Sequence, residues 1–273
     1  MSNRLRMILD NLHDPATLTA TSEALPVAHT QRTGRAYVWR SADLADQVIT
    51  ATLATPAFLE ALVIYRHNLS ATATVRVELL DDTTVVHDTG AVTVSGLIAL
   101  GDFRFGVDPW GATLTDDLPI KQAPFWFSST AVTGYRVTIS DPDNLDGVME
   151  IGRIIAGQVV TPQFNASYGV ALEWQDASEH RRSEGNSLRT LGGGIARRLS
   201  FDLAYMDATG RATLSRAFLQ GGKAGDVYVS LYPETGGLDE AEHAFLARRA
   251  GNYAHTHDFF NNWRADALTF VEV

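Results

Sequence analysis

The sequence has no cysteine among its 273 residues. This absence excludes disulfide bonds, thiolate catalysis and zinc sites with cysteine ligands. Basic residues are in the minority, with 22 Lys and Arg against 32 Asp and Glu, and they are scattered along the chain. The formal net charge of −10 argues against nucleic acid or an anionic membrane as a partner, because both need a concentrated positive surface.

Long apolar runs are also missing. No stretch approaches the roughly 20 apolar residues of a membrane-spanning helix, so membrane insertion is not expected. Residues 1–14 carry charges and no continuous apolar segment, unlike a secretory signal. We therefore expect a chain that is made in a cytosol and stays soluble. Its length fits one large or two ordinary domains.

The sequence does contain apolar side chains at every second residue, a pattern typical of half-buried strands. Residues 61–65 are almost wholly apolar, which predicts a strand buried on both faces. Residues 75–79 alternate and are predicted as the next, half-buried strand, with residues 67–70 as the turn between the two. Pro56 is expected to end an earlier strand. Further strands are predicted at residues 16–21, 36–41, 47–53, 85–88, 135–139 and 148–157.

Residues 95–134 are rich in glycine, proline and aromatic residues, and we expect a long connection there. Trp110 and Trp126, with their aromatic neighbours, could form a platform on which a sugar ring stacks. Alternatively, these rings cover the end of a β-sandwich or fill a subunit interface, where aromatic residues are also enriched. We favour the second interpretation.

The second half combines strands with two helices. The clearest alternation places Leu199, Phe201, Leu203 and Tyr205 on one apolar face. Asp207 is predicted to cap a helix that runs to Gln220 and ends at two glycines. Further strands are predicted at residues 168–174, 227–232 and 265–273, a second helix at residues 238–250, and a flexible turn at residues 192–194.

Several of these segments resemble a known family. Residues 36–41, 61–70, 74–79, 135–139 and 149–154 resemble the discoidin or galactose-binding jelly-roll modules found in tail proteins of tailed bacteriophages. Residues 198–203, the helix after them and residues 268–273 are similar to the C-terminal part of the same phage proteins. The resemblance implies a mainly all-β chain, with a jelly-roll sandwich at residues 1–160 and a β-rich assembly domain with two short helices at residues 161–273.

The resemblance also implies a function. It predicts a structural component of a phage tail tip or baseplate, similar to a distal-tail adaptor between the tail tube and the tip proteins. Such a protein would be assembled in the host cytoplasm, reside in the virion tail, and associate with itself in a ring, a trimer or hexamer, and with other tail proteins. It would not be an enzyme. The alternative is a carbohydrate-binding module that contacts glycans on the host surface.

Three sets of polar residues have two interpretations each. Asp141, Asp143 and Asp146 could converge on a calcium ion, but such residues also favour ordinary turns. No other cofactor is expected. His255, His257 and Asp258 could belong to a metal-dependent hydrolase, or simply serve hydrogen bonds. The arginine pairs are expected to be mostly solvated, and some would cross subunit boundaries in a ring; they lie at residues 181–182, 197–198 and 248–249.

Overall fold

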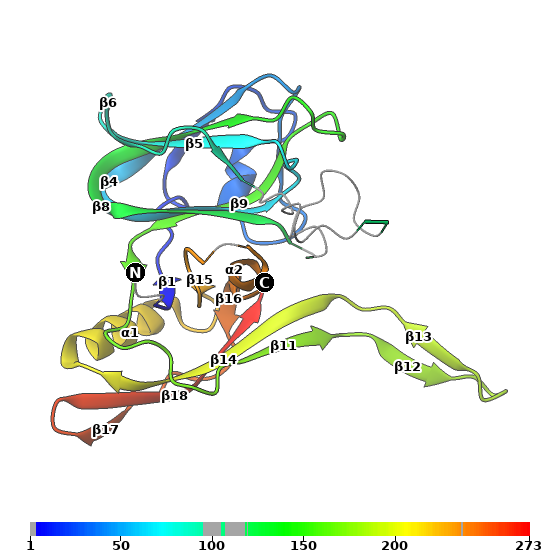
Figure 1. The fold of residues 1–273 in the computed structure, drawn as a ribbon, viewed down its shortest axis with the longest axis vertical. Coiled ribbons are helices and arrows are strands. Elements are labelled where there is room, and N and C mark those ends of the chain that lie inside the picture. The colour runs from blue at the N-terminus through cyan, green and yellow to red at the C-terminus, as the bar shows by residue number, and fades with distance from the viewer. Residues whose placement is uncertain (1–3, 95–104, 107–117, 119, 236) are drawn as a thin grey trace.

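The computed structural model of the chain describes residues 4–94, 105–106, 118, 120–235 and 237–273 (Figure 1). In these residues, β-strands form two sheets of eight strands and one sheet of two strands. The helices are a 3₁₀ turn at Val27–Gln31, α1 (Ala208–Gly221) and α2 (Gly237–Glu242). The strands are β1 (Arg6–Ile8), β2 (Thr17–Ala20), β3 (Trp39–Arg40), β4 (Gln47–His67), β5 (Thr74–Asp81), β6 (Thr84–Asp88), β7 (Val92–Thr93), β8 (Gln122–Ser140), β9 (Glu150–Gly157), β10 (Val159–Val160), β11 (Ala171–Asp176), β12 (Glu179–Arg182), β13 (Leu188–Leu191), β14 (Ile195–Met206), β15 (Asp226–Ser230), β16 (Ala244–Arg249), β17 (Thr256–Phe259) and β18 (Asn262–Glu272). The predicted all-β class with two short helices is confirmed.

The first eight-stranded sheet folds back on itself as a sandwich, the upper unit in Figure 1. Its order is β3-β9-β4-β8-β5-β6, with β2 beside β4 and β7 beside β5. The two longest strands, β4 and β8, pass through both layers. The first part of β4 pairs with β2, and its second part pairs with β9, while β8 follows it throughout. One continuous sheet therefore encloses the sandwich core.

The layer change of β4 falls at an irregular stretch of its pairing with β8. The register shifts between Thr52 and Ala57 and again between Leu59 and Ala61. Pro56 lies in the first shift, so it bends the strand, and the prediction that it ends the strand is wrong. On the partner strand a Cβ atom at Gly134 would lie 2.5 Å from the carbonyl oxygen of Ala51, which explains the glycine at this close approach.

The predicted double burial of residues 61–65 is confirmed. Leu62 and Ile64 belong to the core of the sandwich. Ala61, Val63 and Tyr65 belong to a second core that the sandwich shares with the other large sheet. The predicted neighbour is wrong, because β8 lies between β4 and β5. The strand is thus buried twice because a second unit covers its outer face.

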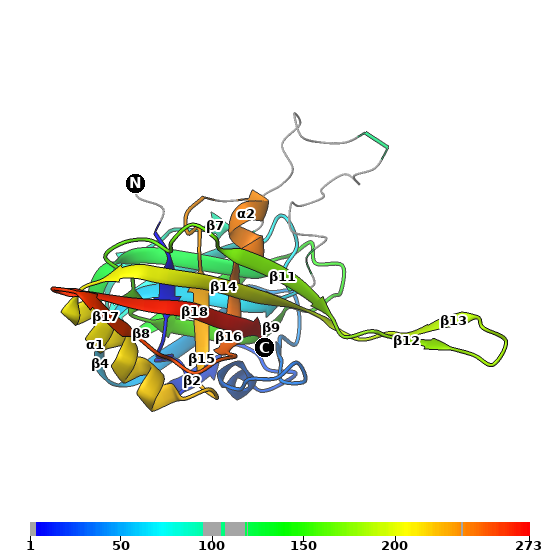
Figure 2. The ribbon, with the colours of Figure 1, turned by 90° about the horizontal axis from the view of Figure 1, so that it is seen from below.

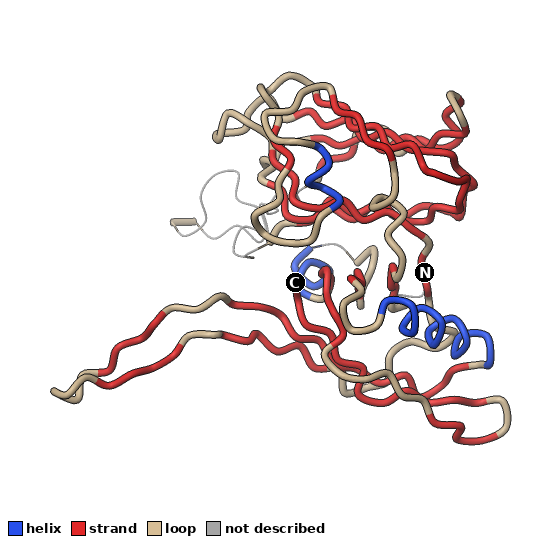
Figure 3. The backbone as a smooth tube through the Cα atoms, turned by 180° about the vertical axis from the view of Figure 1, so that it is seen from behind, coloured by secondary structure: helices blue, strands red, loops and turns tan. Residues whose placement is uncertain are grey.

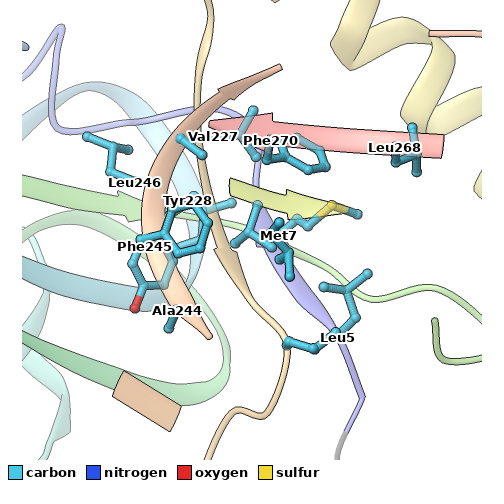
Figure 4. Packing of buried hydrophobic residues seen from close by; sticks show 14 of the residues in the cluster. Leu5, Met7, Val227, Tyr228, Ala244, Phe245, Leu246, Leu268 and Phe270 are labelled. Carbon is cyan, nitrogen blue, oxygen red and sulfur yellow. The ribbon is translucent and has the colours of Figure 1, made fainter. Parts of the chain in front are cut away.

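The second eight-stranded sheet has the order β10-β1-β15-β16-β18-β14-β11, with β17 beside β18. Strand β1, from the start of the chain, pairs with β15, so this sheet joins residues from both ends of the sequence. Figure 4 shows its core, with Met7 of β1 among side chains of β15, β16 and β18. The division of the chain at residue 160 stays a prediction.

Three details of the second half bear on the predictions. The Asp207 carboxylate accepts a hydrogen bond from Gly210 N at 2.7 Å, and α1 ends at Gly222, whose φ is 58°, as predicted. The predicted helix at residues 238–250 is wrong, because only α2 is helical and β16 follows it. The Ala244–Arg249 segment is nearly all buried between two neighbouring strands, and this packing overrides its helical preference.

Tyr205 was predicted in the apolar face of β14, but its side chain is 53% exposed. The pairing of β14 with β18 shifts between Leu203 and Met206. This irregularity turns Tyr205 outward and brings Met206 into the core in its place. Among the residues described, no helix is long and apolar enough to cross a membrane.

Candidate functional site

A two-stranded arm projects from the second sheet (Figures 1 and 2). We define the arm as residues 177–194, which hold β12 and β13 and continue β11 and β14. No residue of the arm is buried. Its hydrogen bonds return to the same ribbon, for example Ala177 N to Gly194 O at 3.1 Å and the His180 ring to Thr190 at 3.0 Å. The arm therefore gains no hydrophobic burial from its own chain.

The reversal at the end of the arm uses residues 183–187, where Asn186 has a φ of 59°. The predicted turn at residues 192–194 is wrong, because these glycines join β13 to β14 without a reversal of the chain. A Cβ atom at Gly193 would lie 2.4 Å from the backbone carbon of Ala177, so this glycine allows the two strands to approach closely. The polar run followed by a Gly-Asn pair was the signal for the true turn.

The arm carries exposed apolar side chains and like charges that face each other. Leu188 and Leu191 are each more than half exposed. Arg181 lies directly opposite Arg189 across the two strands, an unfavourable arrangement of like charges. Arg181 forms an ion pair with Glu179 at 2.9 Å, and both side chains are well exposed. An acidic partner would relieve this repulsion.

The base of the arm is fixed by a buried ion pair. Arg197 in β14 and Glu272 in β18 have side chains that are each 1% exposed, and their charged groups are in direct contact. Arg197 also donates from Nη1 to the carbonyl oxygen of Ala241 at 2.7 Å. The guanidinium lies 4.7 Å from the ring centre of Phe245. The prediction of a mostly solvated arginine pair is therefore wrong for Arg197. The side chain of Arg198 beside it is 42% exposed.

The same carboxylate links the arm to the sandwich. The Tyr65 hydroxyl, from β4, donates to Glu272 Oε1 at 3.0 Å. Burial, with the negative charge of Glu272, raises the pKa of Tyr65 above its ordinary value. A second link runs through Gln122, which donates to Ala244 O at 2.6 Å and accepts from the Tyr228 hydroxyl at 3.0 Å. These contacts, together with the shared core, hold the two units in one arrangement.

Trp126 lines a groove at the junction of the two units. Strand β8 directs Phe125 into the sandwich core and Trp126 toward the second sheet, so the predicted long connection is wrong from residue 122 onward. The guanidinium of Arg6 lies 4.8 Å from the centre of the Trp126 ring and pairs with Glu234 at 2.9 Å. Trp126 Nε1 is buried and has no hydrogen-bond partner within the described structure.

We name this space the tryptophan groove. It has a volume of about 520 Å³ and is lined by Arg6, Glu60, Trp126, Phe127, Ser128, Ser129, Val159, Thr161 and Glu234. Aromatic rings, two carboxylates, a guanidinium and hydroxyl groups are a set that can contact a ligand with several hydroxyl groups. The other predicted stacking residue, Trp110, lies outside the described residues.

The three aspartates of the candidate calcium site have contacts within the protein. Asp141 is fully buried, accepts from Ser70 N at 2.9 Å, and is contacted by the Ser70 hydroxyl and by Asn144 Nδ2. Asp146 accepts from Asn68 Nδ2 at 2.9 Å, and Asp143 lies 3.4 Å from the Thr72 hydroxyl. These carboxylates tie the turn after β8 to the loop after β4.

His257 of β17 and His255 just before this strand lie in an exposed segment. His257 stacks on Trp263 with ring centres 4.8 Å apart, and His255 lies beside Tyr253. Within the part of the chain that the structure describes, no group of three or more His, Cys, Asp or Glu side chains could hold a metal ion. The neighbours of these histidines are aromatic rings rather than ligand groups.

No protein-family model matches this sequence, and no curated protein matches it. Solved structures that this chain resembles include CpGH89CBM32-5 from Clostridium perfringens in complex with GalNAc-β-1,3-galactose. The two are 12% identical with a TM-score of 0.38, and the alignment covers 55% of this chain and 100% of that chain. A Streptococcus pneumoniae fucose binding module, SpX-3, has 10% identity, a TM-score of 0.38 and coverages of 55% and 98%. CBM32-3 from a family 31 glycoside hydrolase of Clostridium perfringens has 16% identity, a TM-score of 0.39 and coverages of 53% and 96%. Likenesses of this size carry no functional conclusion.

Proposed function

We propose that this chain is a structural subunit of a bacteriophage tail tip or baseplate, an oligomeric adaptor between the tail tube and the tip proteins. The arm is the observation that carries the proposal. A hairpin with no buried residue, with exposed apolar side chains and with facing arginines is costly to keep unless a partner covers it. The resemblance of the core segments to phage tail proteins supplies the biological setting.

The junction of the two units supports this role. An adaptor must hold its contact surfaces in a fixed relation, since flexible surfaces lose entropy when they assemble. The shared core and the Arg197–Glu272 ion pair join the sandwich, the second sheet and the base of the arm. Such a subunit acts by burying surface against its neighbours. It has no need of turnover, and it would reside in the virion.

The first experiment compares the full chain with a variant in which Asn-Gly replaces residues 178–193. This two-residue turn would close β11 and β14 as an ordinary hairpin. Size-exclusion chromatography with light scattering is expected to give a trimer or hexamer for the full chain and a monomer for the shortened chain. Equal thermal unfolding of the two proteins would show that the shortened chain still folds. A full chain that is monomeric and absent from purified phage particles would contradict the proposal.

A second candidate function is glycan binding in the tryptophan groove, which the arrangement of Trp126, Arg6 and Glu234 favours. The test is a glycan array followed by calorimetry with any glycan that binds. Glu234→Gln, at an exposed position, is expected to weaken binding without loss of fold, and Trp126→Ala is expected to abolish it. Trp174→Ala, on the other sheet, is the matched control. No binding across a broad array would remove this candidate.

A further inference from the structure

We infer that the arm of one copy docks in a groove beside α1 of a second copy, so that subunits join head to tail. This inference rests on the proposed function and names the partner surface of the arm. The α1 groove consists of two adjoining cavities of about 380 and 430 Å³ that share Gln158, Val160 and Thr213. One wall is α1, and the opposite wall is the bend of β4 in the sandwich.

The position of the α1 groove suits this contact. Figures 1 to 3 place α1 and the arm at opposite ends of the second sheet. An arm cannot reach the groove of its own chain from there, whereas it can reach that of a neighbour. A contact between two different surfaces of identical subunits is heterologous, and it closes into a ring when the rotation allows.

The chemistry of the α1 groove complements the arm. Apolar side chains line it, and among them are Phe58 of β4, which is 52% exposed, and Ala217 of α1. Asp10, Glu60 and Asp207 also line it, against the single positive charge of Arg216. The arm brings three arginines, at residues 181, 182 and 189, against two glutamates, at residues 179 and 184, in a chain whose net charge is −10. Leu188 and Leu191 are three residues apart, so they lie on opposite faces of the arm, Leu188 with Arg182 and Leu191 with Arg181 and Arg189. Each face of an inserted arm would therefore offer a leucine to the apolar side chains and an arginine to the carboxylates of the groove.

Disulfide trapping tests the contact directly, because the natural chain has no cysteine and gives no background. Thr190→Cys places one thiol on the arm and Thr213→Cys places one in the α1 groove, and both positions are exposed. Mild oxidation of a mixture of the two single variants is expected to give a mixed dimer. The double variant is expected to give a ladder of longer oligomers.

The control pairs Thr190→Cys with Thr256→Cys, on the exposed hairpin that β17 begins. Equal or greater cross-linking with this control would overturn the inference, and so would cross-linking that occurs only between two arms. Failure of this inference can be told apart from failure of the proposed function. If the arm-shortened chain is monomeric but the α1 groove gives no cross-link, the proposed function stands and only the docking site is wrong. An arm-shortened chain that still forms the full oligomer removes the proposed function itself.

Charge reversal gives an independent measurement. Arg189→Glu is expected to weaken self-association on the order of tenfold, because the arm would then present a carboxylate to the acidic groove. Adding Asp10→Arg to the same chain is expected to restore most of that loss. Rescue by the double variant supports the pairing of these two surfaces, and weakening without rescue contradicts it.

Discussion

The inner and outer ends of the β11–β14 ribbon contain similar arginine pairs in opposite surroundings. At the inner end, Arg197 is buried against Glu272 and Phe245. At the outer end, Arg181 faces Arg189 in solvent. The inner end therefore contributes to the folding of the single chain, whereas the outer end adds little to it and is available for a partner. The same residue type serves stability at one end and association at the other.

The largest expected effect comes from breaking the inner ion pair. Arg197→Met leaves the Glu272 carboxylate buried without its countercharge, which costs about 3–5 kcal/mol of unfolding free energy. Urea denaturation measures this loss. The matched control is Arg198→Met, where a partly exposed side chain 3.9 Å from Glu173 should cost about 0.5 kcal/mol or less. Equal losses at the two positions would erase the difference between buried and exposed arginine on which the comparison depends.

The next effect comes from pH and is confined to buried histidines. Burial lowers the pKa of His13 to about 3 and that of His67 to about 4. His13 lies between Tyr135 and Thr30, whose hydroxyl donates to Val27 O, so Nε2 donates to Thr30 and Nδ1 accepts from Tyr135. Protonation would place a positive charge in this buried position, close to the positive charge of Arg153. The folded state therefore resists protonation.

Because these folded pKa values lie below the ordinary value of 6.5, the unfolded chain binds protons first as the pH falls. Stability is full above pH 6.5 and declines below it, by on the order of 2 kcal/mol for each histidine at pH 5. Denaturation at pH 7 and pH 5 measures the decline. A His13→Asn/His67→Asn variant should start lower at pH 7 but lose much less between the two values. An unchanged decline in that variant would show that other groups are responsible.

A smaller effect is expected at the start of α1, which forms a wall of the α1 groove. Asp207→Ala removes the acceptor for Gly210 N and should cost about 1 kcal/mol. Asp207→Ser keeps a capping oxygen and should restore most of that stability. If serine fails to restore it, the loss comes from the acidic charge rather than from the helix cap.

The sequence allowed the elements with local signals to be predicted. The apolar run at residues 61–65, the cap at Asp207 and the final glycine of α1 follow from adjacent residues, and the structure agrees. The burial of Arg197 could not be predicted, because Arg197–Arg198 and Arg181–Arg182 look alike in one dimension. Its partner Glu272 lies near the other end of the second half, and only the sheet brings the two together.

The candidate sites were predicted less completely than the fold. Trp126 was selected for its ring, but its surroundings come from β1 and the segment after β15, far away in the sequence. The layer change of β4 was missed because a proline usually ends a strand. In this chain Pro56 instead lies within a register shift of a continuing strand. Both the surroundings of Trp126 and the course of β4 depend on contacts between segments far apart in the sequence. The local residue pattern does not specify such contacts.

The smallest change in stability is expected at the arm. A substitution there gives the sharpest test of the difference between the inner and outer ends of the ribbon. Leu188→Ser combined with Leu191→Ser replaces two exposed side chains that lie outside both hydrophobic cores, so the unfolding free energy should change by about 0.5 kcal/mol or less. If the arm serves association, the same variant should nevertheless shift the oligomer toward the monomer in light scattering at equal concentration. Leu145→Ser, at a fully exposed position of the sandwich, should leave both quantities unchanged. A loss of stability without a change in assembly would place the arm with the folded core and remove the contrast between the two ends of the ribbon.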